Sequence, residues 1–382
     1  MAHYVNIKPE LLRWAIKRSG LAIGDYKEGV EKWLSGEKKP THDQLEKFAR
    51  RAMVPFGYLF LEQPPNEDLP VPDYRTRTDE GVREPSPNLI ETIFEMQTRQ
   101  DWLGEYLAEE GHAELPFVGS AKIGANIRPL AQRMHEELGL TESWAERCPS
   151  WEDALRNLRD AIEEAGIFVF VSGVVGINTH RALDPDEFQG FVLVDRIAPL
   201  VFVNGADFKV AQMFTIAHDL AHVWVGQSAL FDLVATDPAD FEVEKYCNAV
   251  AAEFLVPAEK LEQAWPRAAG GDSVFISLAQ RFKVSPIVVA RRAKDRRLIT
   301  NEEFFDFYQR YMKRERTKKE GRSPGGDFWK TQKQRLGRRF GRAVITAAQE
   351  GRLSYSDAYE LTGLYGKTFD KYAQFLHEGN RE

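Results

Sequence analysis

The stretch FTIAHDLAHVWVG, from Phe214 to Gly226, constrains this chain most, because it places two histidines four residues apart in an apolar segment. On an α-helix, residues four apart share a face, with Cβ atoms about 5–6 Å apart. The side chains of His218 and His222 could therefore reach one metal ion, with Asp219 beside them. The spacing predicts a metal site on a helix from about Phe208 to Val225, although such a pair can also be two satisfied core histidines.

A catalytic zinc site needs three protein ligands and one open position. The chain has only two cysteines and no CxxC pattern, so we expect histidine and carboxylate ligands. The segment EVEKYCNAVAAEFLVP offers three candidates for the third ligand: Glu242, Glu244 and Glu253. On a helix, Glu244 would lie on the same side as Asn248, four residues later.

Three β-branched and aromatic segments precede the histidine helix, with turn residues between the last two. They are Ile167–Gly173, Gly190–Asp195 and Pro199–Asn204, and they predict a small antiparallel sheet. Helical patterns precede the sheet at Asn88–Glu110, Ser120–Leu138 and Trp151–Ala165. A polar loop and further helices follow Gly226, the first from about Phe241 to Phe254. We therefore expect an α+β fold.

FTIAHDLAHVWVGQ and VEKYCNAVAAEFLVPAE resemble the ImmA/IrrE family of zinc metallopeptidases, as does INTHRALDPDEFQGFVLVDRIAPLVFVNGAD. The resemblance covers most of Ile123 to Tyr311. It implies a zincin-like core that binds Zn²⁺ through His218, His222 and Glu244. It also leaves supporting or structural roles to Asn248 and Glu253.

Asp219 departs from the family pattern, in which a glutamate at this position acts as the catalytic base. Aspartate is one methylene shorter, so its carboxylate would fall about 1 Å short, an error that can cost on the order of 100-fold in rate. Zinc binding should survive, because the base is not a ligand. Three residues are candidates by type for stabilising an oxyanion, and the sequence does not choose among them: His180, Tyr246 and Arg291.

The N-terminal segment, from LLRWAIKRSG to VPFGYLFL, resembles the Cro/repressor type of helix-turn-helix found in long members of this family. The space between Gly20 and Trp33 is short for the two central helices of that motif. Residues 1–55 carry eleven Lys or Arg against seven Asp or Glu, and Glu28 and Glu31 fall in the expected recognition region. We therefore expect a degenerate module used for protein contacts rather than DNA binding.

A basic run from Lys313 to Arg342 contains twelve Lys or Arg against three Asp or Glu, although the whole chain has a net charge of -7. Such a run can bind nucleic acid, bind an acidic partner, or be a solvated linker. It contains a candidate hinge, GRSPGG. The helical segment after it is either a small helix-turn-helix or a cap docked on the peptidase.

The expected organisation is a helical module over 1–62, a Pro-rich connector over 63–87, a peptidase domain over 88–312, a basic linker over 313–327 and a helical module over 328–382. No secretory signal or membrane span is evident, so we expect a cytoplasmic location. The resemblance implies cleavage of a specific protein, often a repressor or a member of a toxin–antitoxin pair. The alternative is a non-catalytic antitoxin or DNA-binding regulator that uses the peptidase fold as a scaffold.

Overall fold

The computed structural model describes residues 3–27, 29–67, 77–78, 81–82, 85–207, 209–231, 238–265, 271–318 and 327–378. The chain forms two compact units, one of Met1–Pro70 with Val82–Phe94 and one of Val71–Gly81 with Glu95–Glu382. Much of the expected connector and the whole GRSPGG segment lie outside the described residues. A two-residue hairpin, β1 (Arg77–Thr78) with β2 (Gly81–Val82), lies within the connector.

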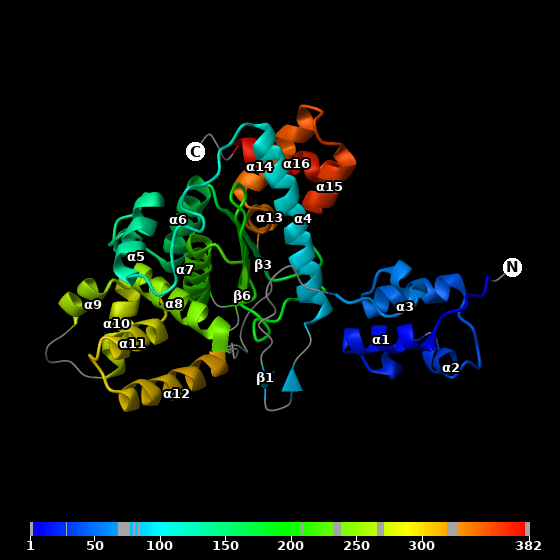
Figure 1. Ribbon diagram of the computed structural model, residues 1–382, viewed down its shortest axis with the longest axis horizontal. Helices are drawn as coiled ribbons and strands as arrows, with labels where there is room; N and C mark the ends of the chain where they lie inside the picture. The colour runs from blue at the N-terminus through cyan, green and yellow to red at the C-terminus, as the bar shows by residue number, and fades with distance from the viewer. Residues whose placement is uncertain are drawn as a thin grey trace. The chain divides into compact units, whose positions relative to one another are not determined.

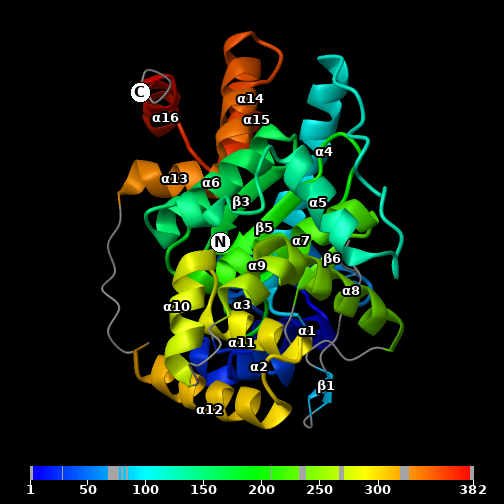
Figure 2. The ribbon, with the colours of Figure 1, turned by 90° about the vertical axis from the view of Figure 1, so that its left-hand side faces the viewer.

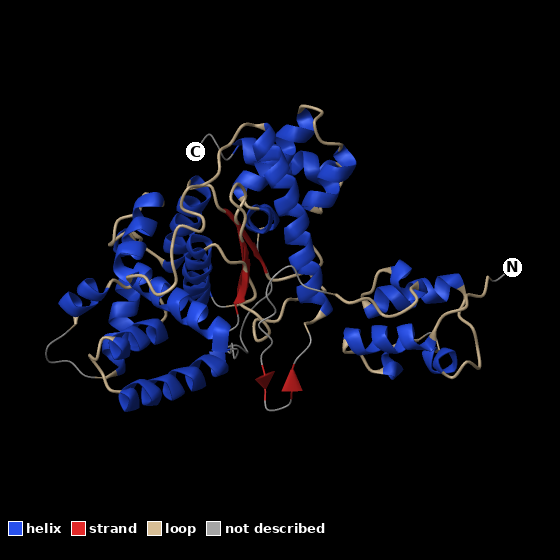
Figure 3. Ribbon diagram, viewed as in Figure 1, coloured by secondary structure: helices blue, strands red, loops and turns tan. Residues whose placement is uncertain are grey.

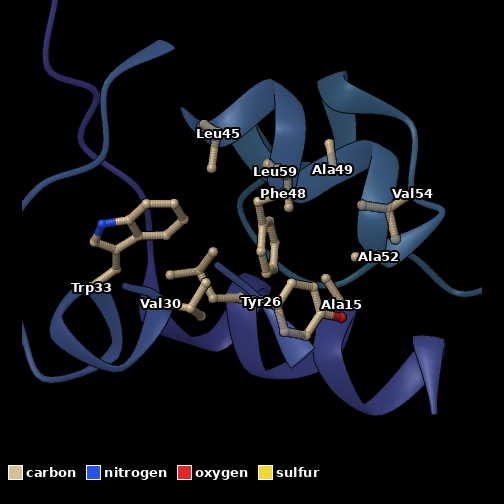
Figure 4. Packing of buried hydrophobic residues seen from close by; sticks show 11 residues of the cluster. Ala15, Tyr26, Val30, Trp33, Leu45, Phe48, Ala49, Ala52, Val54 and Leu59 are labelled. Atoms are coloured by element: carbon tan, nitrogen blue, oxygen red, sulfur yellow. The ribbon is translucent and has the colours of Figure 1, made fainter. Parts of the chain in front are cut away.

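The first unit is built on three helices: α1 (Pro9–Ser19), α2 (Val30–Leu34) and α3 (His42–Ala52). Their apolar faces enclose a core around Phe48, which contacts Tyr26 and Trp33 (Figure 4). Among its described residues, the space between Gly20 and Trp33 holds no full-length helix. The chain forms only a short 3₁₀ turn, η1 (Ile23–Asp25), before Gly29 takes a left-handed conformation (φ 76°) that delays the start of α2.

The second unit contains a four-stranded sheet in the order β3–β5–β4–β6. The strands are β3 (Phe168–Ser172), β4 (Gly190–Leu193), β5 (Leu200–Asn204) and β6 (Ala229–Phe231). The expected antiparallel sheet is wrong for β3, which pairs in parallel with β5, and the sheet is mixed. Residues 173–189 keep the chain at the carboxyl end of β3, so β4 begins there and runs back along the sheet, and β5 then returns parallel to β3. The strand β6 lies in the segment expected to be a polar loop.

Helices cover both faces of the sheet (Figure 3). One face is packed against α7 (Lys209–Val225), which contacts β4 and β5. The other face lies toward residues 95–109 of α4 (Pro87–Glu109), where Gln100 donates hydrogen bonds to the carbonyls of Leu193 and Ala198. The sheet is therefore an inner layer, which agrees with the complete burial of β3, β4 and β5.

The helix expected at Ser120–Leu138 begins later, at Ile127, as α5 (Ile127–Glu137). Gly124 has a left-handed φ of 81°, and Asn126 caps the helix, so the preceding residues form turns instead. The next helix is α6 (Trp151–Glu164), which starts at the Ser150 cap, and a 3₁₀ turn, η3 (Ala145–Arg147), separates the two.

The remaining helices form two groups in Figure 1. The first begins with α8 (Pro238–Leu255), which packs on the histidine helix, and continues with α9 (Ala258–Ala264), α10 (Asp272–Phe282), α11 (Pro286–Asp295) and α12 (Asn301–Lys318). The second is C-terminal: α13 (Phe328–Leu336), α14 (Arg338–Gln349), α15 (Tyr355–Thr362) and α16 (Lys367–Glu378). Among the described residues, no single helix meets the length and hydropathy needed to cross a membrane, and the bent pair α10–α11 meets them only jointly.

The C-terminal helices pack on the sheet unit through Arg99 of α4. Its guanidinium lies over the rings of Phe170 and Phe340 and donates to the carbonyls of Leu361 and Arg335. These contacts favour the expected docked cap over an independent helix-turn-helix. They also bury arginines of the basic run, as described below.

Candidate metal centre

The histidine helix α7 is held at its C-terminal end by a close approach of two glycines. An ideal Cβ on Gly226 would lie 2.7 Å from the Cα of Gly119, so no larger residue fits without movement. This approach lets the amides of Gly119 and Ala121 donate to the carbonyls of Val223 and Trp224. Carbonyls at a helix end need such partners, so the loop fixes where α7 stops, at Val225, within one turn of His222.

The structure brings the three predicted ligands together. His218 and His222 project from α7, and Glu244 projects from the adjacent α8. The two Nε2 atoms lie 3.0 Å apart, and the Glu244 oxygens lie 3.1 Å from His218 Nε2 and from His222 Nε2. Their donor atoms therefore converge on one point between two helices.

This donor set fits a divalent metal ion. In a tetrahedral site with ligand distances of about 2.0–2.1 Å, neighbouring ligand atoms lie roughly 3.3 Å apart, close to the separations seen here. Both imidazoles are fully buried, and Glu244 is 5% exposed. A buried carboxylate facing two imidazole nitrogens needs a positive charge beside it, and a bound cation or protonated histidine supplies one.

The electrostatics of the cluster agree with a cation site. Burial tends to raise the pKa of Glu244, but hydrogen bonds from His218 and His222 outweigh it and hold the pKa at about 2. Burial lowers the pKa of His218, although Glu244 and Asn248 oppose this through hydrogen bonds. Neutral imidazole and ionised carboxylate are the forms that bind a metal.

Asp219 lies on the same helix and is fully buried, and neither of its carboxylate oxygens has a hydrogen-bond partner among the described residues. Burial, and then the charge of Glu244, raise the pKa of Asp219 well above its usual value. Its Oδ2 packs against β4, where an ideal Cβ on Gly190 would lie only 2.9 Å away. The carboxyl group is thus able to hold a proton.

The other predicted site residues separate into two groups. Asn248 hydrogen-bonds His218, which places it beside the cluster. Glu253 is turned away: it forms a buried ion pair with Arg292 of α11, and its Oε1 accepts from the amide of Ala258 at 3.3 Å. Glu242, the remaining alternative as third ligand, is exposed.

The three oxyanion candidates also differ. His180 and Arg291 are exposed. Tyr246, two residues after Glu244, is buried, and its hydroxyl has no hydrogen-bond partner among the described residues. Residues two apart on a helix do not share a face, so the burial of Tyr246 does not by itself bring its hydroxyl to the cluster.

Sequence reasoning missed Gly190 and Arg292. Gly190 begins a strand with an ordinary backbone conformation, so only the helix packed on it reveals why a side chain is excluded. Arg292 stabilises Glu253 and donates from Nε to the carbonyl of Val256 at 3.1 Å, which ties α11 to the end of α8. Neither role leaves a signal in spacing or composition.

Comparison with known proteins places this site in a recognised type of domain. Residues 162–294 match the Peptidase_M78 family, described as an IrrE N-terminal-like domain, and residues 336–375 match a domain family of unknown function, DUF8813. No curated protein matches the chain. One solved structure, a Mycobacterium tuberculosis transcriptional regulator, is 16% identical with a TM-score of 0.28, and the match covers 51% of each chain, about half the length of that structure.

Proposed function

We propose that the chain is a zinc-dependent metallopeptidase of the ImmA/IrrE type whose catalytic power is reduced by Asp219. The observation that carries the proposal is the convergence of His218, His222 and Glu244 in the segment that matches the Peptidase_M78 family. Two imidazoles and one carboxylate are a ligand set known from zinc peptidases, in which a fourth position stays open.

When bound, zinc would polarise a substrate carbonyl and make water more acidic. The chain's own residues supply the rest. Asp219 would accept a proton from water and return it to the leaving amine, the general acid–base role of a carboxylate beside a catalytic metal. Asn248 orients His218. The short aspartate limits how well the proton is transferred.

The substrate we propose is a specific protein, such as a repressor or a member of a toxin–antitoxin pair. The zincin-like core supplies the chemistry, and the flanking helical modules supply partner contacts. In the first unit, α2 has only five residues, little more than one helical turn. A recognition helix of that length is poorly suited to the major groove, which favours a protein-binding role for this module.

Binding of DNA through the basic run is a weaker part of the proposal. Four of its arginines are partly withdrawn from solvent: Arg335, Arg338, Arg339 and Arg342. Arg339 stacks on Phe168 and donates to the carbonyl of Glu163, so it contributes to packing. Any phosphate contacts would depend on the other basic residues of the run.

A second candidate function is a non-catalytic binding protein, an antitoxin or a regulator. The specific observation in its favour is that His218, Asp219 and His222 are all fully buried, whereas a peptidase must admit a peptide to its metal. In this view the metal stabilises a scaffold. The two candidates share the metal and differ in whether any peptide bond is cut.

The metal is tested by elemental analysis of the purified protein beside His222→Ala. We expect about one zinc per chain in the native protein and loss of most of it in the variant, because two ligands bind zinc far less tightly than three. Equal zinc in both proteins would remove the basis of the proposal.

Cleavage is tested separately in a lysate of the source organism, by labelling and sequencing new protein N-termini by mass spectrometry. New termini that appear with the native protein and are missing with His222→Ala support a peptidase. A zinc-loaded protein that generates none, but that captures a defined partner, supports the scaffold.

A further inference from the structure

A cavity separate from the metal centre lies at the carboxyl ends of the parallel strands β3 and β5. It has a volume of about 210 Å³. Its walls come from α6 and α13, each of which packs against β3 (Figure 2). Its floor includes Ser172, the last residue of β3, Gly205, which follows β5, and Gln212 of α7. Ligands of open α/β sheets commonly bind outside the carboxyl ends of parallel strands.

Two arginines from different helices line this cavity: Arg159 of α6 and Arg335 of α13. Both are half-buried, and neither guanidinium makes a hydrogen bond or an ion pair with any residue that the structure describes. The neighbouring arginines are engaged, because Arg156 pairs with Asp153, and Arg338 lies close to the Glu163 carboxylate. Arg159 is attracted by the charges of Asp160 and Glu163 but forms no ion pair with either. Arg335 has no charged partner among the described residues.

We propose that this cavity binds the phosphate or diphosphate group of a small molecule, clamped between the guanidiniums of Arg159 and Arg335. Each guanidinium presents a fork of N–H donors that suits phosphate oxygens. The cavity is small for a drug-sized ligand, for which about 300–1,000 Å³ is usual, and it suits a phosphate group with a small attachment. The only carboxylate in its lining is Glu152, which is exposed.

One contact fixes the end of the helix that carries Arg335. Arg99 donates to the backbone carbonyl of Arg335 at 3.4 Å, which anchors the end of α13. The hydroxyls at the site donate elsewhere: Thr331 to the carbonyl of Asp327 and Ser172 to that of Val174. The two guanidiniums are the cationic donors of the lining, and the Gln334 amide is a further neutral donor. Burial lowers the pKa of Arg335, which agrees with a charge that lacks a partner in the unliganded protein.

The cavity and the metal centre share a helix, because Gln212 lies on α7, which also carries His218 and His222. A ligand that contacts Gln212 would act on the helix that carries two metal ligands. The binding proposal does not depend on the proposed peptidase function, and it would stand if no peptide bond is ever cut.

The experiment is a calorimetric titration of the full-length protein with pyrophosphate, with ionic strength held constant by sodium chloride. The test variants are Arg159→Gln and Arg335→Gln. The matched controls are Arg156→Gln on α6 and Lys333→Gln on α13, two exposed residues outside the cavity lining. Because pyrophosphate can also chelate a metal, every titration is repeated in the His222→Ala background.

We expect saturable binding by the native protein, the two controls and His222→Ala alone. Binding should weaken by about tenfold or more in each test variant, the scale of losing charge-assisted hydrogen bonds. Arg335→Lys, which keeps the charge without the planar fork, should be intermediate, and circular dichroism of each protein checks that it is folded.

Three results would overturn the proposal. The first is the absence of saturable binding by the native protein. The second is an equal loss in Arg156→Gln or Lys333→Gln, which would indicate a general effect of positive charge. The third is a duplex DNA oligonucleotide that binds more tightly than pyrophosphate and depends on the same two arginines, which would assign them to nucleic acid instead.

Discussion

Gly190 on β4 and Asp219 on α7 are in direct contact, although they lie on separate layers of the fold. A Cβ placed on Gly190 would lie 2.9 Å from Asp219 Oδ2, 2.8 Å from the carbonyl oxygen of Phe202 and 2.7 Å from Thr215 Cγ2. The strand therefore sets how closely the histidine helix approaches the sheet. It also closes one side of the carboxyl group that is the candidate proton acceptor.

The first prediction is that Gly190→Ala lowers the free energy of unfolding by about 1–3 kcal/mol, the usual cost of overpacking a buried site. Alanine also lowers the backbone entropy of the unfolded chain, but this stabilises the folded protein by only about 0.4–1 kcal/mol. The net effect is destabilising because one of the atoms in the way is a backbone carbonyl, which cannot rotate aside. Urea unfolding followed by circular dichroism measures it.

Gly104→Ala provides the control for this change. Gly104 lies within α4, and a Cβ there would meet no atom within 4 Å. Since alanine is favoured over glycine inside a helix by up to about 1 kcal/mol, this variant should be as stable as the native protein or more stable. If both variants have the same stability, the contact between Gly190 and Asp219 is looser than described.

The second prediction separates the two buried glutamates of α8. Glu244→Gln should weaken zinc binding by about 100-fold or more, beyond the 10–100-fold typical of residues that only support a ligand. Glu253→Gln should keep zinc and instead lower stability, because it leaves the buried guanidinium of Arg292 without its carboxylate. Competition with a chromophoric chelator gives the affinity. If only Glu253→Gln loses zinc, then Glu253 is the zinc ligand and Glu244 has the structural role.

The third prediction concerns the docking of the C-terminal helices. Arg99→Met should lower the free energy of unfolding by about 3 kcal/mol, since it breaks a buried ion pair with Glu95 and leaves the Leu361 carbonyl without its donor. The same change at Arg352, whose ion pairs are more exposed, should cost less than about 1 kcal/mol. Limited proteolysis should also cut α14–α16 faster in Arg99→Met. Equal stabilities would mean that the helices dock by apolar contacts alone.

The fourth prediction is a pH dependence that arises from His135. Its Nε2 lies 3.0 Å from the carbonyl oxygen of Phe254, which can only accept, so Nε2 carries the proton. Burial lowers the pKa of His135 below its unfolded value of about 6.5, although the Phe254 carbonyl opposes the shift. The unfolded chain therefore binds the second proton first. The contribution of His135 to stability is complete above about pH 6.5 and is lost as the pH falls toward the lower folded pKa.

This dependence is measured by urea unfolding at pH 7.5, 6.5 and 5.5 in the native protein and in His135→Gln, which retains an amide donor for Phe254. The native protein should lose up to about 1.4 kcal/mol more per pH unit than the variant below pH 6.5, the effect of one proton. Parallel curves would indicate that His135 titrates normally in the folded protein.

The sequence predicted the histidine helix well, because both ligands and the apolar residues around them follow one helical period. Glu244 was selected from three glutamates only through family resemblance, since all three lie in one helical segment and spacing does not show which turns inward. The structure gives the reason: Glu253 is taken by Arg292, and Glu242 faces solvent.

Strand direction could not be predicted in the same way. Every residue of β3 and β5 is buried, so neither strand has an alternation that marks one face, and direction depends on where residues 173–189 carry the chain. The strand β6 was missed because three residues, Ala229–Phe231, are too few for a pattern. Close approaches such as Gly119 with Gly226 join positions far apart in sequence and leave no local signal.

The last prediction concerns the length of the Asp219 side chain. Asp219→Glu adds the methylene that the family pattern includes, and Gly190 leaves little space on the strand side. The longer side chain must therefore displace β4 or reach away from it. If it reaches away, the rate at which new N-termini form in the lysate should rise by one or two orders of magnitude. This is the scale of the loss expected from a misplacement of about 1 Å. Zinc content should not change, because Asp219 is not a ligand.

The matched control is Asp219→Asn, which keeps the size of the side chain and removes its ability to take a proton. Cleavage that rises in Asp219→Glu and disappears in Asp219→Asn would show a weakened peptidase. Cleavage by the native protein that falls in both variants would show a site rebuilt around aspartate, with β4 fitted to the shorter side chain. If none of the three proteins cuts while all bind zinc and the same partner, the carboxyl group has no catalytic role and the fold serves as a binding scaffold.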